Sequence, residues 1–156
     1  MSTFNVQNPN NGKTEEEFNR INDSDRDAIL DRAKEAFASW RQAPIEQRAK
    51  VLSKTAQLYR DRQDELAEYI GREMGKPTAQ AKDELQTTWE IYEWYAEHAH
   101  ELLADKPLAA QGALQTYVRK DPLGVLLGVM PWNFPYYQVA RWAAPNLLLG
   151  NTLVLK

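Results

Sequence analysis

Apolar residues recur at three- and four-residue steps through the first two thirds of the sequence, a spacing that places them on one face of a helix. The pattern predicts one helix over residues 25–41, with Asp23 or Ser24 as its cap. A second helical pattern begins at Pro44 and continues to a stop signal at residues 75–77, where a glycine is followed two residues later by a proline.

A third helix is predicted over residues 78–104, and its apolar face is rich in aromatic residues. We interpret this face as core packing rather than as a binding surface, because such stripes usually face a protein interior. The polar residues 1–24 contain a turn at residues 8–12. The apolar positions of the third helix are Ala81, Leu85, Thr88, Trp89, Tyr92, Tyr95, Ala96, Ala99 and Leu103.

The period changes further along the chain. Residues 115–120 alternate and are rich in β-formers, which favours an exposed or edge strand. Residues 124–130 form a short continuous apolar run, which is typical of a strand buried on both faces. A helix over residues 136–149, interrupted by Pro145, and a second apolar strand over residues 152–155 complete a strand–helix–strand unit. The sequence therefore predicts an α/β protein, in which a helical N-terminal region packs on the start of a parallel, Rossmann-like sheet.

Charged residues are concentrated in the first 120 positions, and residues 121–156 contain only Asp121, Arg141 and Lys156. The net charge of −3 and the lack of a basic cluster argue against nucleic-acid binding. No apolar stretch approaches the roughly 20 residues of a membrane span, and the first residues lack the pattern of a secretory signal. A cytoplasmic protein without nucleic-acid or membrane partners is the simplest expectation.

The sequence PWNFP at residues 131–135 follows the first apolar strand, where open α/β sheets bind their ligands. Two prolines restrict the backbone on either side of Asn133 and so give it a rigid mount. A fixed side-chain amide can donate to an oxyanion, and such donors are worth about 3–4 kcal/mol in other enzymes. The alternative is that Asn133 is a turn residue that bonds its own backbone, and spacing alone does not decide between the two.

PWNFP is preceded by GVLLGVM at residues 124–130 and followed by a helix and GNTLVLK at residues 150–156. This arrangement closely resembles the aldehyde dehydrogenase superfamily. EMGKP at residues 73–77 is similar to the family's E-x-GKP turn, and TYVRKDPLG at residues 116–124 is similar to the segment before its cofactor strand. The resemblance spans nearly the whole chain and is most specific over residues 116–156. It implies the NAD(P)-dependent oxidation of an aldehyde to the carboxylic acid.

The resemblance also implies roles for individual residues. Asn133 matches the asparagine whose amide helps to form the oxyanion hole. Met130, Pro131 and Trp132, together with Asn133, match the stretch that lines the nicotinamide ribose and phosphate side of the cofactor. Lys156 matches the lysine that hydrogen-bonds the adenosine ribose of NAD or the 2′-phosphate of NADP, and the sequence does not choose between these cofactors. The alternative for Lys156 is a frayed terminal lysine.

Arg141 is the only charged residue between Pro122 and Leu155. Because an unpaired buried cation is costly, Arg141 either binds an anionic substrate, pairs with a structural carboxylate, or is exposed. An arginine at this spacing from the asparagine resembles succinate-semialdehyde dehydrogenases, in which it binds the far carboxylate of the substrate, a contact suited to a guanidinium. We therefore expect succinate semialdehyde as the substrate. A dehydrogenase for another aldehyde, with Arg141 structural, is the alternative.

The sequence contains no cysteine and so lacks the family's nucleophile, and it offers no metal site. The resemblance implies the N-terminal part of an NAD(P)-binding domain, an incomplete aldehyde dehydrogenase fold with the catalytic domain absent, which we do not expect to be active alone. Its expected parts are a helical region at residues 1–114, an oligomerisation-type strand at 115–121 and the first strand–helix–strand unit at 124–156. We expect the full-length enzyme to be a homo-oligomer. The opposing hypothesis is a degenerate, non-catalytic interaction module.

Overall fold

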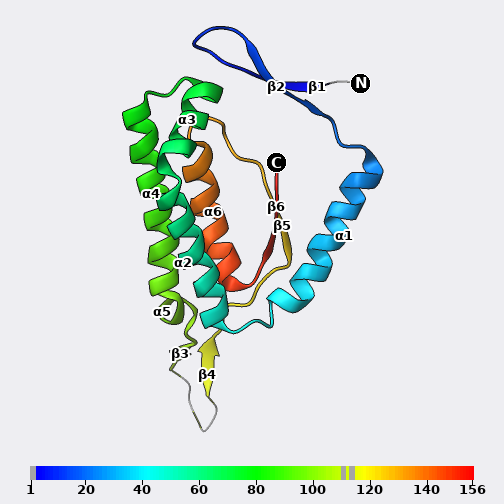
Figure 1. Cartoon of the computed structure of the whole chain (residues 1–156). Coiled ribbons are helices and arrows are strands. Elements are labelled where there is room, and N and C mark those ends of the chain that lie inside the picture. The colour runs from blue at the N-terminus through cyan, green and yellow to red at the C-terminus, as the bar shows by residue number, and fades with distance from the viewer. Residues whose placement is uncertain (1–2, 110–111, 113–114) are drawn as a thin grey trace.

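The computed structural model describes residues 3–109, 112 and 115–156. It contains helices on both sides of a small parallel sheet (Figure 1). The helices are α1 (Asp23–Trp40), α2 (Ile45–Asp61), α3 (Gln63–Met74), α4 (Thr78–Glu97), α5 (Ala99–Leu103) and α6 (Pro135–Leu149). The strands are β1 (Thr3–Gln7), β2 (Thr14–Asn19), β3 (Lys106–Leu108), β4 (Thr116–Val118), β5 (Val125–Gly128) and β6 (Thr152–Leu155).

The C-terminal part is a strand–helix–strand unit, as the sequence predicts. Strands β5 and β6 pair in parallel, with Val125 opposite Thr152 and Gly128 opposite Leu155. Pro135 is the first residue of α6, a position where its missing N–H is not needed. The helix continues through Pro145 and ends at Gly150, where the chain turns back into β6. Both strands therefore end at the same edge of the sheet.

The main core lies where α2, α4 and α6 pack together. Tyr59 of α2 and Tyr92 of α4 stack with their ring centroids 5.8 Å apart, which confirms that the aromatic stripe of α4 is packing surface. This side of the molecule is a layer of helices, with α6 between the sheet and the α2–α4 pair (Figure 1). The buried members of this core are Leu52, Ala56, Tyr92, Ala99, Ala140, Ala144 and Leu148.

The second helical pattern is interrupted in the structure, so the prediction of one continuous helix from Pro44 to the 75–77 turn is wrong. The chain leaves helical geometry at Arg62, with φ −109° and ψ 20°, and α3 starts at the next residue. The break lets α3 pack against the start of α4 in a separate cluster of Ala67, Ile70, Ala81 and Leu85. The third predicted helix also breaks once, at His98, into α4 and α5.

Two antiparallel hairpins lie outside the helical layers, and the sequence prediction missed three of their four strands. Strands β1 and β2 pair around the predicted turn at residues 8–12, where the Asn8 backbone N–H donates to the Lys13 carbonyl at 2.9 Å. Strand β4 lies in the predicted 115–120 segment, and its partner is β3. The predicted boundary between residues 114 and 115 falls partly outside the described residues. The domain division and the oligomerisation role of β4 stay predictions.

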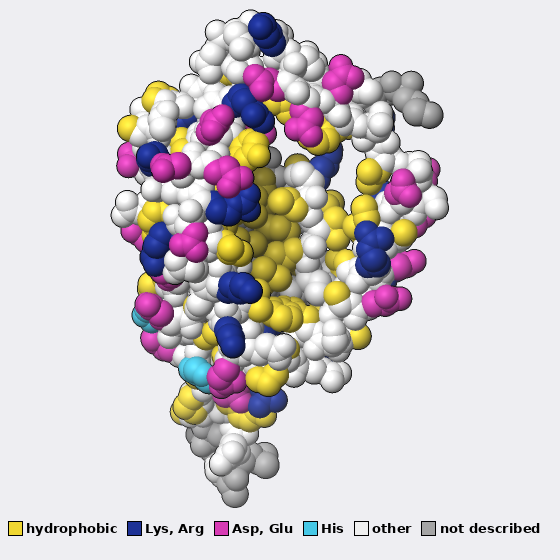
Figure 2. All heavy atoms as spheres, in the orientation of Figure 1, with side chains coloured by type: hydrophobic (Ala, Val, Ile, Leu, Met, Phe, Trp, Pro, Cys, Tyr) yellow, Lys and Arg dark blue, Asp and Glu magenta, His cyan; other side chains and the backbone are white. Residues whose placement is uncertain are grey.

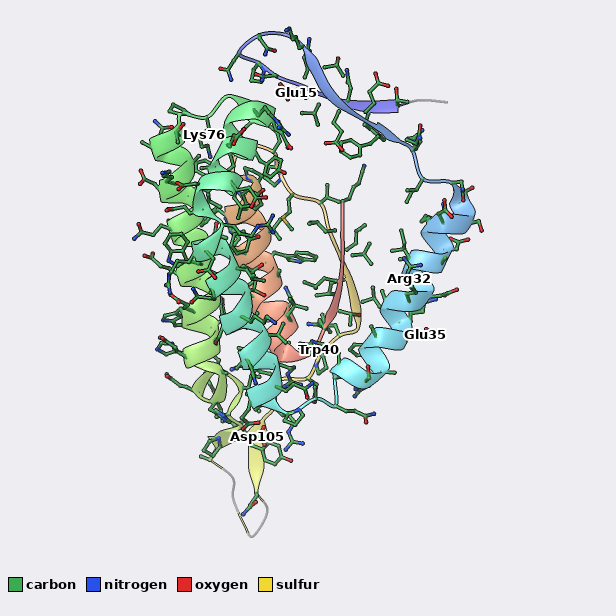
Figure 3. All side chains as sticks on the ribbon, viewed as in Figure 1. Glu15, Arg32, Glu35, Trp40, Lys76 and Asp105 are labelled. Carbon is green, nitrogen blue, oxygen red and sulfur yellow. The ribbon has the colours of Figure 1, made fainter. Side chains whose placement is uncertain are left out.

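Helix α1 lies on the opposite side of the sheet from α6 (Figure 1). Its cap is Asn22, whose side chain accepts from the Asp25 N–H, rather than Asp23 or Ser24 as predicted. Two side-chain hydrogen bonds attach α1 to the strand–helix–strand unit: Thr152 Oγ1 donates to the Ala33 carbonyl at 2.9 Å, and Trp40 Nε1 donates to the Leu147 carbonyl at 3.0 Å. Trp40 is at the end of α1 next to α2, far from Lys76 (Figure 3).

Strand β5 is only partly covered, so the prediction of a strand buried on both faces is wrong for this chain. Leu127 of β5 is 67% exposed, and Val129, directly after the strand, is 64% exposed. Helix α1 bonds to the start of β6, at Thr152, while side chains at the other end of β5 are exposed. Hydrophobic side chains accordingly gather in the hollow between α1 and the layer of helices on the other side of the sheet (Figure 2). No helix in the described part of the chain is long and apolar enough to cross a membrane.

Candidate active site

The residues predicted to face the cofactor lie together at the carboxyl edge of the parallel sheet. Met130, Pro131 and Trp132 follow β5, and Lys156 follows β6. The Lys156 backbone N–H donates to the Gly128 carbonyl at 2.9 Å, which continues the strand pairing to this edge. Trp132 is 74% exposed and the Lys156 side chain is exposed, so both are accessible to a ligand.

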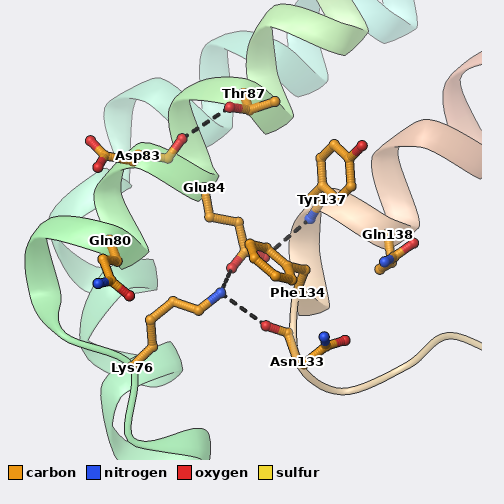
Figure 4. A pocket seen from close by; sticks show the side chains of 9 residues that line it. All are labelled: Lys76, Gln80, Asp83, Glu84, Thr87, Asn133, Phe134, Tyr137 and Gln138. Atoms are coloured by element: carbon orange, nitrogen blue, oxygen red, sulfur yellow. Dashed lines mark hydrogen bonds and ion pairs between the residues drawn. The ribbon is translucent and has the colours of Figure 1, made fainter.

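Asn133 lies between β5 and the first turn of α6, and its backbone and side chain have different surroundings. Its backbone carbonyl accepts from Lys76 Nζ at 2.9 Å. Its side-chain amide makes no hydrogen bond to any of the described residues and points away from Lys76 (Figure 4). The turn-residue alternative, in which Asn133 bonds its own backbone, is therefore not the arrangement seen here.

Lys76 and Glu84 form a buried ion pair next to this loop, and the sequence analysis assigned a role to neither (Figure 4). Their side chains are 7% and 0% exposed. Gly75 ends α3 with φ 75°, a left-handed conformation that glycine adopts without strain, and so turns the chain toward Lys76. Glu84 comes from the second turn of α4. Two sequence signals could have identified the pair. Lys76 is part of the family-like EMGKP turn. Glu84 lies three residues after Ala81 and one before Leu85, on the buried face of its helix.

The carboxylate of Glu84 also binds the start of α6. Its Oε1 atom accepts from the backbone N–H of Tyr136 at 3.0 Å and of Tyr137 at 3.2 Å. These groups belong to the first turn of a helix, where the N–H donors have no partner within the helix. A negative charge there is also favoured by the helix dipole. Phe134, the N-cap residue of α6, makes no side-chain capping bond. Glu84, from another helix, caps α6 instead.

A cleft of about 650 Å³ opens between the start of α4 and the start of α6. Phe134 covers part of its wall, with Lys76 Nζ 3.7 Å from the ring centroid. Beneath the loop, Tyr59 packs edge-on against Tyr136 at 5.6 Å. Burial raises the pKa of Tyr59 to about 12 and also raises the pKa of Tyr136, so both rings are neutral at ordinary pH. The cleft is lined by Lys76, Gln80, Asp83, Glu84, Thr87, Asn133, Phe134, Tyr137 and Gln138.

Arg141 lies one helical turn after Tyr137, a residue of the cleft wall. Its guanidinium carbon is 5.8 Å from the centroid of the Tyr137 ring, and the residue is exposed. No carboxylate among the described residues forms an ion pair with it, which removes the structural-pair alternative within this part of the chain. Arg141 is thus an exposed cation next to Tyr137, a residue that lines the same cleft as Asn133. In the described residues, no group of His, Asp and Glu side chains forms a metal site.

The model of the aldehyde dehydrogenase family matches residues 1–156. The chain belongs to this family. It is 41% identical over 154 residues to the succinate-semialdehyde dehydrogenase [NADP(+)] of Deinococcus radiodurans. The aligned region covers 98% of this chain and 32% of that protein. It is 44% identical over 151 residues to succinate-semialdehyde dehydrogenase [NADP(+)] 1 of Mycobacterium tuberculosis, covering 96% of this chain and 33% of that protein.

A solved structure agrees with this assignment. The succinic semialdehyde dehydrogenase of Streptococcus pyogenes, in complex with NADP+, superposes with a TM-score of 0.93 at 34% identity. The match covers 97% of this chain and 33% of that one. The predicted family and the predicted α/β fold are therefore confirmed. This chain spans about a third of the length of the curated dehydrogenases it matches.

Proposed function

We propose that this chain is the oxyanion- and cofactor-binding part of an NADP-dependent aldehyde dehydrogenase that oxidises succinate semialdehyde to succinate. The observation that carries the proposal is the position of Arg141. This exposed cation, without an ion-pair partner among the described residues, lies one turn from the wall of the cleft that Asn133 also lines. The names of the relatives, which specify succinate semialdehyde and NADP(+), support the same substrate and cofactor.

Asn133 would donate its side-chain amide N–H to the aldehyde oxygen as negative charge develops there during nucleophilic attack. The amide is suited to this role because its backbone is fixed while the amide itself has no bond to a described residue. A preorganised donor of this kind stabilises the transition state without a reorganisation cost. The nucleophile has to come from outside these residues, because the sequence contains no cysteine.

Met130, Pro131 and Trp132 would face the cofactor together with Lys156. Their position fits NADP+, because parallel sheets bind dinucleotides at the carboxyl ends of their strands. The exposed Trp132 ring and the Lys156 ammonium provide a flat surface and a cation for a ribose or a 2′-phosphate. When bound, NADP+ would supply the acceptor for the aldehyde hydride.

The substrate proposal is tested by the activity of the full-length protein with succinate semialdehyde and with butanal, which lacks the carboxylate. We expect Arg141→Gln to remove a charge-assisted contact worth about 1.5–3 kcal/mol. This corresponds to a rise in KM for succinate semialdehyde of roughly 10- to 150-fold. The KM for butanal should stay within about two-fold, since butanal has no group that a guanidinium binds.

Arg32→Gln, on the exposed surface of α1 (Figure 3), is the matched control and should leave both KM values unchanged. An Arg141→Gln enzyme with an unchanged KM for succinate semialdehyde would show that Arg141 does not bind the carboxylate. If the full-length protein fails to reduce NADP+ whichever aldehyde is supplied, the enzymatic proposal itself is refuted and the interaction module is favoured.

A further inference from the structure

The Lys76–Glu84 pair differs from the other ion pairs in the described part of the chain, because both of its side chains are buried. The Arg60–Glu93 pair between α2 and α4, for comparison, has side chains that are 45% and 34% exposed. Removing two charges from water is costly, so a buried pair contributes little to stability on its own account. The position of the pair therefore indicates that it holds the neighbouring backbone in place.

The pair binds the backbone on both sides of Phe134. On one side, Lys76 Nζ donates to the Asn133 carbonyl at 2.9 Å. On the other side, Glu84 Oε1 accepts from the Tyr136 and Tyr137 N–H groups at 3.0 and 3.2 Å. The ammonium also lies over the Phe134 ring at 3.7 Å. Two side chains that are more than fifty residues away in sequence thus fix the backbone from Asn133 into α6.

The Asn133 amide depends on this arrangement for its direction. No described residue forms a hydrogen bond with the amide, so its direction follows from the backbone that carries it. The two prolines restrict individual torsions of the loop, but neither attaches the loop to the rest of the molecule. That attachment comes from α4 and the turn before it (Figure 4).

We propose that Lys76 and Glu84 are positioning residues for the oxyanion-hole amide of Asn133. Lys76 binds the carbonyl of Asn133 itself, and Glu84 both orients Lys76 and fixes the helix start that follows the loop. This inference rests on the proposed function, since it assigns a purpose to Asn133 that only the aldehyde-oxidising reaction requires. A displacement of about 1 Å at a reacting centre is enough to cost roughly 100-fold in rate.

The test is a double-mutant cycle between Glu84→Gln and Asn133→Ala in the full-length enzyme, measured by kcat with succinate semialdehyde. Glutamine keeps an oxygen for the α6 N–H groups and removes the charge that orients Lys76. Asn133→Ala should lower kcat by about 100- to 1000-fold. Glu84→Gln should lower kcat by about 10-fold in the wild-type background and by less than about two-fold in the Asn133→Ala background, because coupled residues are not additive.

Two further variants separate positioning from a general loss of structure. Glu93→Gln also replaces a glutamate of α4 by glutamine, but in the more exposed Arg60–Glu93 pair. This control should leave kcat unchanged. Lys76→Met with Glu84→Gln removes both charges together and so avoids an unpaired buried charge, in case Glu84→Gln alone fails to fold. This double variant should fold, keep its dissociation constant for NADP+ within about two-fold and still lose about 10-fold in kcat.

Equal effects of Glu84→Gln with and without Asn133 would overturn the positioning role and leave a purely structural helix cap. An unchanged kcat in the Lys76→Met/Glu84→Gln variant would overturn it as well. Failure of the proposed function looks different, because the wild-type protein would then oxidise no aldehyde. A wild-type enzyme that is active, with additive variants, refutes only the positioning inference.

Discussion

Gly128 ends β5 in contact with the Trp142 side chain of α6, and its replacement by alanine tests how tightly the strand–helix–strand unit is packed. A Cβ at residue 128 would lie 2.6 Å from Cη2 and Cζ3 of Trp142 and 2.9 Å from Cζ2. Carbon atoms in contact prefer about 3.5–4.0 Å, so the indole would have to move by roughly 1 Å. The φ angle of Gly128 is not positive, so alanine introduces a steric conflict without backbone strain.

Two opposing terms set the magnitude for Gly128→Ala. Overpacking a filled space costs about 1–3 kcal/mol. Replacing a glycine by alanine at a compatible backbone position stabilises by about 0.4–1 kcal/mol through the unfolded state. The expected net loss in the free energy of unfolding is therefore about 1–2 kcal/mol. In a Trp142→Leu background the indole is absent, and Gly128→Ala should become neutral or stabilising.

Urea unfolding followed by far-UV circular dichroism measures all four members of this cycle. Gly71→Ala is the matched control, because a Cβ there meets only the Lys76 carbonyl at an ordinary 3.5 Å. Since Gly71 lies inside α3, alanine should stabilise it by up to about 1 kcal/mol. If Gly128→Ala lowers the free energy of unfolding by the same amount with and without Trp142, the indole is not the source of the conflict and the reasoning fails.

Two further predictions concern the core. The pKa of Tyr59, raised by burial to about 12, means that the free energy of unfolding should fall as the pH rises from about 10 through 12. Tyr59→Phe should make that decline shallower by up to roughly 2–3 kcal/mol in urea titrations across this range, and an unchanged decline would contradict the assignment. Leu148→Ala should lower the free energy of unfolding by about 2–5 kcal/mol, because Leu148 is 1% exposed. Leu58→Ala, at a residue 50% exposed, should cost far less in the same measurement.

The elements that the sequence predicted well are those with a strong internal pattern. Helices α4 and α6 each bury one consistent set of residues, and helix periodicity reports such a set directly. Strands β5 and β6 were predicted from their short continuous apolar runs. The break at Arg62 had no such signal, because the apolar spacing continues across it without glycine or proline. The β1–β2 hairpin was missed because β2, TEEEFN, is polar except for Phe18 and is exposed throughout.

The candidate site shows the same limit at the level of single residues. Asn133 and Lys156 stand out because they follow apolar strands, on the side where open sheets bind their ligands. Glu84 does not stand out, because a glutamate in a helix is usually solvated, and only the fold brings it to the Tyr136 N–H. The partial exposure of β5 could not be predicted either, because an apolar run indicates a strand but not which elements cover it.

The attachment of α1 has a consequence for the order in which the molecule assembles. Its two side-chain hydrogen bonds to the strand–helix–strand unit span 119 and 107 residues of sequence, and no residue of α1 is fully buried. During translation at about 5–20 residues per second, the partner of Ala33 emerges roughly 6–24 s after it. In proteins, most of the stability of a helix comes from tertiary packing rather than from helix propensity. The hydrogen bonds that attach α1 to Leu147 and Thr152 therefore form only after the strand–helix–strand unit has been synthesised, so α1 waits for its tertiary partners.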